Sequence, residues 1–305
     1  MRIADAHCDT LFSIGVHGHS AENCTVTAPR MEEGGVCLQT FALFAGSQGP
    51  AGQPYQKAVS MCEVMDKVQV PMLLGRLPDE MPDAPAGVIS IEGCEIFEGS
   101  ICRVDEFTSR YRVRMAALTW NNENELGYSA KSQSPEGLKP FGLHFVREAD
   151  RRGILCDVSH LNDAGFWQLV EKAELPPVAS HSNCRALANH FRNLTDDMIR
   201  ALIEREGFMG MNFCAAFLAR EGTATLDHLF AHMDHVLELG GEKILGFGSD
   251  FDGIDEWPEG LGDPRDFVRL VDLMRAHGYS EETVENICWK NFWRVLKKAE
   301  AHASI

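Results

Sequence analysis

A pair of side chains able to bind a metal ion lies near the start of the chain, in the segment Asp5-Ala-His-Cys-Asp9. His7 and Asp9 are two residues apart, so in an extended strand both side chains point to the same side. Imidazole nitrogen suits zinc, and a carboxylate can bridge two divalent ions. Cys8 lies between them and points to the opposite side of such a strand, which favours a structural role for this thiol.

Four other short apolar runs also end in a histidine or an acidic residue, and these residues are Glu92, His160, His181 and Asp250. Taken singly, each has an ordinary structural interpretation, because a histidine at a strand end commonly makes a hydrogen bond and an aspartate there can cap the next helix. With the first pair they supply three histidines, two aspartates and one glutamate. If the runs are strands that end at one edge, this set predicts a metal site.

The elements that must position these residues are eight strands, predicted at residues 2–7, 36–44, 87–92, 113–120, 154–160, 177–181, 208–213 and 243–250. Each run is short and apolar, as parallel strands buried on both faces are. Helical periodicity lies between most of them, including 226–237, the segment after Thr195, 267–274 and 284–296.

Eight strands alternating with helices predict a single (β/α)8 barrel of the TIM type over residues 1–305, an α/β fold. In such a barrel the carboxyl ends of all strands meet at one rim, where active sites of this fold lie. An open doubly wound sheet is the alternative. It requires a glycine fingerprint after the first strand, and His7-Cys-Asp-Thr-Leu11 is not one.

Composition limits the possible partners and the cellular location. The 305 residues include 28 Lys+Arg and 45 Asp+Glu, so the net charge is −17, which disfavours binding to nucleic acid or to anionic membranes. The best apolar run, 41–45, is far shorter than the ~20 residues of a membrane-spanning helix, and we expect no signal peptide. The ten cysteines form no C-x-x-C pair, which favours reduced thiols and a cytoplasmic location.

Several motifs along nearly the whole chain match one family. The matching segments are Asp5-Ala-His-Cys-Asp9, Ser90-Ile-Glu-Gly93, Pro140-Phe-Gly142, Gly153-Ile-Leu-Cys-Asp-Val-Ser-His160, Ser180-His-Ser182, Arg192-Asn193 and Gly248-Ser-Asp-Phe-Asp-Gly253. Together they resemble the membrane (renal) dipeptidase family of zinc metallopeptidases, which belongs to the amidohydrolase-like barrels. The resemblance implies hydrolysis of dipeptides, including those with a C-terminal D-residue, by a hydroxide between two zinc ions.

The resemblance also implies a role for each candidate residue. His7 and Asp9 would bind one zinc ion, His160 and His181 would bind the other, and Glu92 would bridge the two ions. Arg192 would hold the substrate carboxylate, and Asp250 would move protons. The family often forms dimers, so a homodimer is possible. Its membrane anchor is not carried over to this chain.

One position departs from the family pattern. The best-known members carry a histidine after the fourth strand that is thought to contact the substrate carbonyl, and this chain has Trp120 there. Either a zinc ion or a neighbour such as Asn121 takes over that contact, and Trp120 either contacts substrate or packs. Two other functions stay open: a different binuclear amidohydrolase acting on a cyclic amide or lactone, and a catalytically silent peptide-binding barrel. No predicted strand ends in the bridging lysine of many binuclear relatives, which disfavours the first.

Overall fold

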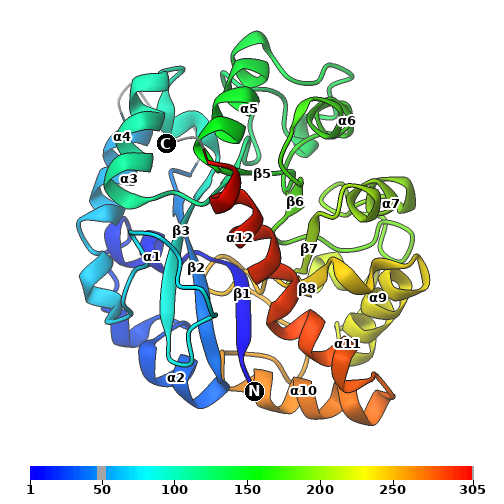
Figure 1. Cartoon of the computed structure of the whole chain (residues 1–305). Helices are drawn as coiled ribbons and strands as arrows, with labels where there is room; N and C mark the ends of the chain where they lie inside the picture. Colours follow the sequence, from blue (N-terminus) through cyan, green and yellow to red (C-terminus); the bar gives the residue numbers. More distant parts are fainter. Residues whose placement is uncertain (47–52, 304–305) are drawn as a thin grey trace.

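The computed structural model describes residues 1–46 and 53–303 and is a closed barrel of parallel strands surrounded by helices (Figure 1). The strands are β1 (Ile3–Cys8), β2 (Val36–Phe44), β3 (Ala86–Glu92), β4 (Met115–Ala117), β5 (Leu155–Asp157), β6 (Val178–Ala179), β7 (Phe208–Met211) and β8 (Leu245–Phe247). They pair in chain order, and β1 closes the barrel on β8 through Asp5 and Phe247. The predicted fold class is therefore confirmed.

Every predicted strand is present, although the later ones are shorter than predicted. The run predicted at 177–181 forms a ladder only at β6, Val178–Ala179, and the run at 154–160 only at β5, Leu155–Asp157. The residues after each ladder leave the sheet, and His160 does so with a left-handed backbone (φ 67°). The apolar runs thus continue past the sheet because the residues that follow it remain buried.

The main helices lie outside the barrel and are α1 (Thr10–Gly15), α2 (Ala28–Gly34), α3 (Gln53–Cys62), α4 (Ile101–Tyr111), α5 (Pro140–Arg152), α6 (Asp163–Lys172), α7 (Asp196–Glu204), α8 (Ala215–Leu218), α9 (Leu226–Glu238), α10 (Asp266–His277), α11 (Glu281–Glu285) and α12 (Asn291–His302). The helix predicted after Thr195 is α7, and the Thr195 side chain caps it by accepting a hydrogen bond from the backbone N–H of Met198. The predicted terminal helix is interrupted by a π-helical turn at Asn286–Lys290.

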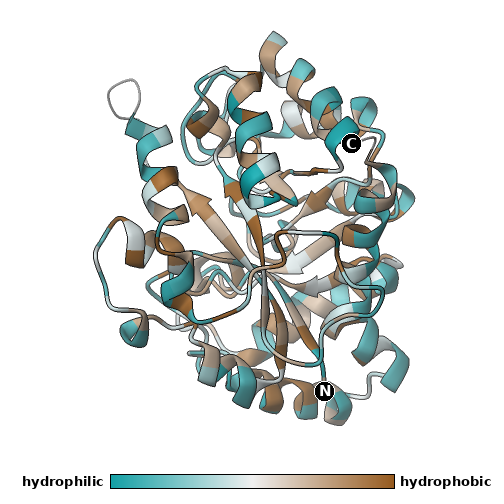
Figure 2. Cartoon of the chain, turned by 60° about the vertical axis from the view of Figure 1, so that its left-hand side comes forward, coloured by the Kyte–Doolittle hydropathy of each residue, from teal (hydrophilic) through white to brown (hydrophobic). Residues whose placement is uncertain are grey.

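Apolar side chains fill the barrel and the space between strands and helices. Every residue of β1, β3, β7 and β8 is buried. Figure 2 shows hydrophobic residues along the central strands and hydrophilic ones on the outer helices. Among the described residues no helix combines the length and the apolar composition needed to cross a membrane. The ten cysteines all lie within the described part and are free thiols, and Cys8 is fully buried, as predicted.

Candidate metal centre

The six predicted ligand and acid–base residues meet at the carboxyl ends of the strands. His7 lies on β1, Asp9 is the first residue after this strand, and Glu92 is the last residue of β3. The other three follow β5, β6 and β8, and they are His160, His181 and Asp250. All six are buried, and several line a cavity of about 580 Å³ that opens at this rim.

Glu92 occupies the centre of the cluster. Its Oε1 atom lies 3.0 Å from His160 Nε2 and 3.4 Å from His181 Nε2. Its other oxygen, Oε2, lies 3.7 Å from His7 Nε2. The two oxygens of one carboxylate therefore face different histidines, which is the arrangement a bridging ligand requires.

His7 connects this group to a second set of carboxylates. Its Nε2 atom lies 3.5 Å from Asp9 Oδ2 and 3.7 Å from Asp250 Oδ1. Two sets of three side chains bring their donor atoms within 4.8 Å of one another, one formed by His7, Glu92 and His181 and the other by His7, Asp9 and Asp250. The donor atoms thus form two adjoining groups that share His7.

Hydrogen bonds behind the ring nitrogens indicate which atoms face the cluster. Ser180 Oγ donates to Asp157, so it is left to accept from the Nδ1–H of His181 at 2.7 Å. Asn121 Oδ1 lies 3.2 Å from His160 Nδ1, where it accepts the proton of that ring. Both imidazoles therefore direct an unprotonated Nε2 at the cluster, and such outer hydrogen bonds are typical of metal-binding histidines.

Several atoms of the cluster have no suitable protein partner. His160 Nε2 and His181 Nε2 face each other at 3.2 Å, and two lone pairs at that distance repel unless a cation lies between them. His7 Nε2 and Asp9 Oδ1 are buried without a hydrogen-bond partner, which is costly. A Cβ at Gly253 would lie 2.1 Å from Asp9 Oδ2, so only glycine leaves this space open. The donor set fits divalent cations, and its imidazole and carboxylate composition suits zinc.

Burial and the neighbouring charges shift the pKa values of the cluster, and for His7 the two act in opposite directions. Burial lowers the pKa of His7, but the nearby charges of Glu92 and two aspartates outweigh burial and raise it to about 10. Burial and the Asp9 carboxylate raise the pKa of Glu92 well above its usual value, and burial raises that of Asp250 to about 6. Three buried carboxylates close together thus attract a positive charge, which a metal ion would supply in place of the His7 proton.

Two site residues have an uncommon backbone conformation. His160 and Asp250 both have φ values near +65°, in the left-handed region that side chains other than glycine rarely adopt. Such strain persists only where the surrounding structure enforces it, and it clusters at functional sites. Here it turns both side chains from their strand ends into the cluster.

Arg192 lies in the loop between β6 and α7, and its side chain is buried. Nη2 donates to the carbonyl of His181 at 3.2 Å, the guanidinium lies 5.6 Å from the ring centre of Phe217, and Nε has no hydrogen-bond partner. Burial lowers its pKa, while the charges of Asp250 and Glu92 oppose that shift. The neighbouring acids of α7 have other partners, so Arg192 is not a surface arginine of that helix.

Trp120 and Asn121 both line the cavity. The Trp120 ring contacts Phe44 at 4.8 Å between centroids and lies 6.2 Å from the His160 ring. Trp120 is therefore both a packing residue and part of the cavity surface. Asn121 contacts the cluster through its hydrogen bond with the His160 ring.

The sequence interpretation missed several residues around the site. Asn212 Nδ2 donates to Asp250 Oδ2 at 2.9 Å and fixes this carboxylate. It lies in the seventh predicted strand region, so the search for polar residues at strand ends offered a signal for it. His17 is the second such residue, and it lines the cavity beside Phe12.

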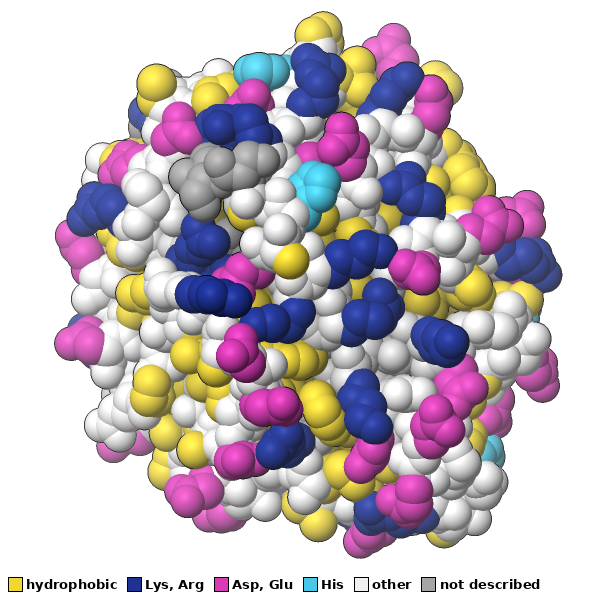
Figure 3. Space-filling view, viewed as in Figure 1, with side chains coloured by type: hydrophobic (Ala, Val, Ile, Leu, Met, Phe, Trp, Pro, Cys, Tyr) yellow, Lys and Arg dark blue, Asp and Glu magenta, His cyan; other side chains and the backbone are white. Residues whose placement is uncertain are grey.

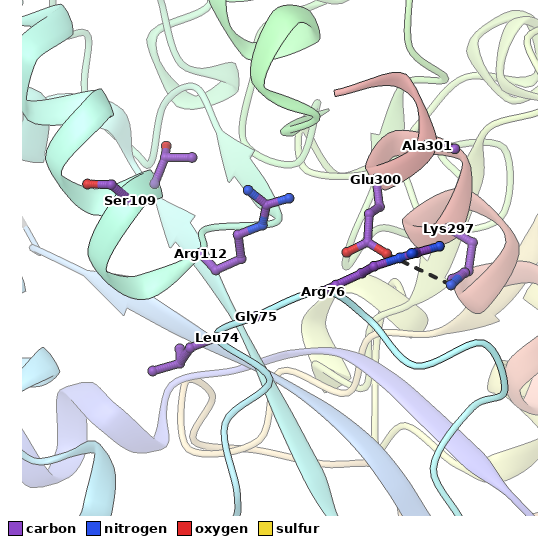
Figure 4. Close-up of a pocket in the computed structure, with 9 residues that line it drawn as sticks. Leu74, Gly75, Arg76, Ser109, Arg112, Lys297, Glu300 and Ala301 are labelled. Atoms are coloured by element: carbon purple, nitrogen blue, oxygen red, sulfur yellow. Dashed lines mark ion pairs between the residues drawn. The ribbon is translucent and has the colours of Figure 1, made fainter. Parts of the chain in front are cut away.

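A second cavity, of about 530 Å³, lies at the opposite end of the barrel (Figure 4). Its lining residues precede β3 and β4 or belong to α12, and they include Arg76, Arg112, Lys297 and Glu300. Figure 3 shows other Lys and Arg side chains on this face of the molecule. The described residues that line this cavity include no histidine or cysteine, so they offer no ligand set like that at the rim.

Comparison with known proteins agrees with the geometry. The chain matches the family model described as membrane dipeptidase, peptidase family M19, over residues 1–304. A Klebsiella pneumoniae protein described as an uncharacterised protein in the pqqA 5′ region is 35% identical over 222 residues, which cover 70% of this chain and 81% of that protein. An uncharacterised dipeptidase of Schizosaccharomyces pombe is 30% identical over 250 residues, 81% of this chain and 59% of the yeast protein.

Solved structures show the same architecture. A metallopeptidase from Rhodobacter sphaeroides, crystallised with a phosphinate mimic of the dipeptide L-Ala-D-Ala, superposes with a TM-score of 0.87 at 26% identity, covering 98% of this chain and 99% of that one. The family match extends over nearly every residue and includes all the clustered side chains. The chain belongs to the membrane dipeptidase family of peptidases.

Proposed function

We propose that the protein is a metal-dependent dipeptidase that binds two divalent ions, zinc by the chemistry of its donors, and that residues 1–305 form one catalytic domain. The observation that carries the proposal is Glu92, whose two oxygens face separate groups of donors. His160 and His181 would hold one ion with Glu92 Oε1. His7 and Asp9 would hold the other with Glu92 Oε2. Divalent ions held by these residues would supply a water whose pKa is lowered to about 7 and a positive charge for the scissile carbonyl.

The residues of the chain provide the remaining requirements for peptide hydrolysis. Arg192 offers a planar fork of donors that matches a carboxylate. Because it lies beside the metal ligands, it would accept only substrates whose carboxylate follows directly after the scissile bond, which are dipeptides. Asp250, held by Asn212 and with a pKa near 6, would take a proton from the attacking water and pass it to the leaving amine.

Two further proposals follow from the comparisons and the thiols. A D-residue at the second position would be accepted, which the R. sphaeroides metallopeptidase with its mimic of L-Ala-D-Ala supports. Ten free thiols, most of them buried, support a reducing compartment, and we propose the cytoplasm.

Metal analysis and a dipeptide assay test the function together. Protein purified without chelator should carry close to two equivalents of zinc or a similar ion, and it should release amino acids from L,L and L,D dipeptides in a ninhydrin assay. Trace metal only, with no activity after zinc is added, would show the dipeptidase proposal to be wrong. Full metal content with turnover of a lactone but of no dipeptide would instead favour another amidohydrolase reaction.

A further inference from the structure

One side of the cavity at the rim is covered by a row of rings. Consecutive ring centres lie 4.8 Å apart between Trp120 and Phe44, 4.8 Å between Phe44 and Phe12, and 4.6 Å between Phe12 and His17. We call these four residues the aromatic wall. All four line the cavity, and the three apolar rings are half-buried, so each keeps a free surface towards it.

The order of strands places this wall opposite Arg192. In a closed barrel of eight strands in chain order, β6 lies four strands from β2 in either direction. Arg192 follows β6, whereas Phe44 ends β2, and the wall extends from α1, which follows β1, to Trp120, which follows β4. The metal ligands lie between, because they come from β1, β3, β5 and β6. Arg192 and the middle of the aromatic wall, at Phe44, are therefore at the two ends of a path across the metal centre.

A dipeptide fits this path in one direction. Two extended residues span about 7 Å, so a substrate with its carboxylate at Arg192 and its scissile carbonyl over the ligands places its first residue at the far side. We propose, resting on the dipeptidase function proposed above, that the aromatic wall binds the side chain of the N-terminal residue. The preferred substrates are then dipeptides with a bulky apolar or aromatic first residue.

Two acidic residues at the same cavity would instead favour a basic N-terminal residue in the substrate. Asp255 and Glu256 line it as well, and on their own they would attract a lysine or arginine side chain. Both are exposed, so water and salt screen their charges. A phenylalanine or leucine side chain that leaves water for the wall gains the full benefit of apolar burial, which corresponds to about tenfold to hundredfold in kcat/KM over glycine. The apolar preference should therefore dominate.

The test compares four dipeptides with the metal-loaded wild-type protein. We expect kcat/KM for Phe-Ala to exceed that for Gly-Ala at least tenfold, and Lys-Ala to fall below Phe-Ala. The kcat/KM for Ala-Phe should exceed that for Gly-Ala by a smaller factor than Phe-Ala does, because its large residue lies on the Arg192 side. Equal values for Phe-Ala and Gly-Ala, or a higher value for Lys-Ala, would overturn the inference while leaving a dipeptidase. Failure to cleave any of the four with two metal ions bound would instead refute the proposed function.

Variants then locate the preference on the wall. Trp120→Ala and Phe44→Ala should each lower the ratio of Phe-Ala to Gly-Ala to about threefold or less. Phe217→Ala, which removes a half-buried ring from the Arg192 side of the same cavity, is the matched control and should keep the wild-type ratio. The ratio does not depend on the fraction of active protein, and Trp120→Leu provides a milder second variant. Retention of the wild-type ratio in both alanine variants of the wall would overturn the assignment.

Discussion

Replacement of Arg192 by alanine tests whether this side chain binds the substrate carboxylate. The guanidinium is buried, and its Nε has no hydrogen-bond partner among the described residues, so it has a donor to spare for a ligand. A hydrogen bond to a charged group contributes about 1.5–3 kcal/mol, which corresponds to roughly tenfold to hundredfold in kcat/KM. We expect Arg192→Ala to lower kcat/KM for Ala-Ala by that factor.

The informative assay varies the substrate and the enzyme together. Amidation of the dipeptide's C-terminus removes the negative charge, so it should cost the wild-type enzyme about as much as the mutation does. The Arg192→Ala enzyme should be nearly indifferent to amidation, because the partner of the carboxylate is already gone. Arg200→Ala is the matched control, since this arginine pairs with Asp197 on the exposed side of α7. It should behave as wild type with both substrates.

The comparison separates a binding role of Arg192 from a structural one. If Arg192 only supported the neighbouring His181 loop, the variant would lose metal or activity but would remain as sensitive to amidation as the wild type. Metal content, measured on the same samples, shows whether the site is still loaded. Equal sensitivity to amidation in both enzymes would refute the reasoning, and the restriction to dipeptides would lose its physical basis.

Three further predictions concern the ligands, the acid–base residue and stability. Glu92→Gln should lower metal content and turnover together, because Glu92 faces both groups of donors; elemental analysis that finds two ions would contradict its bridging role. Asp250→Asn should keep close to two ions but lower kcat by roughly 10²–10⁴; loss of metal would make it a ligand instead. Burial lowers the pKa of His232 to about 4, and its Nδ1 accepts from the backbone N–H of Cys184 at 3.0 Å. The unfolded chain binds this proton near pH 6.5, so stability should fall as the pH drops from 6.5 towards 4, by about 1 kcal/mol at pH 5.5. Urea unfolding at pH 7 and 5.5 should show a smaller loss in His232→Gln, and an equal loss would contradict the assignment.

The barrel and its donor set were predictable because both leave local signals. Buried parallel strands are apolar over their whole length, and a charged or imidazole residue at the end of such a run is conspicuous. The ends of the strands were not predictable. His160 and His181 belong to apolar runs that continue beyond the ladder, because the residues that turn towards the site are buried as deeply as those in the sheet.

The aromatic wall left no signal of that kind. Its rings come from the ends of two strands, β2 and β4, and from α1 and the residues just after it, and only the folded barrel brings them together. Phe12 and Phe44 each look like ordinary core residues in their own segments. Asn212 lies at the end of a predicted strand, but its contact with Asp250 depends on β7 and β8 being neighbours. Contacts between strand ends require the register of the barrel, which the chain shows only when folded.

Two buried aspartates explain how such short ladders hold the site in place. Asp5 accepts hydrogen bonds from the backbone and the hydroxyl of Ser249, at 2.8 and 2.5 Å. Asp157 accepts from the same two groups of Ser180, with the backbone bond at 3.0 Å. Each serine directly precedes a functional residue, Asp250 or His181, on the neighbouring strand end. Side-chain bonds thus continue the pairing of adjacent strands where the ladder stops, and β6 can end after two residues because Asp157 fixes the residue that precedes its ligand.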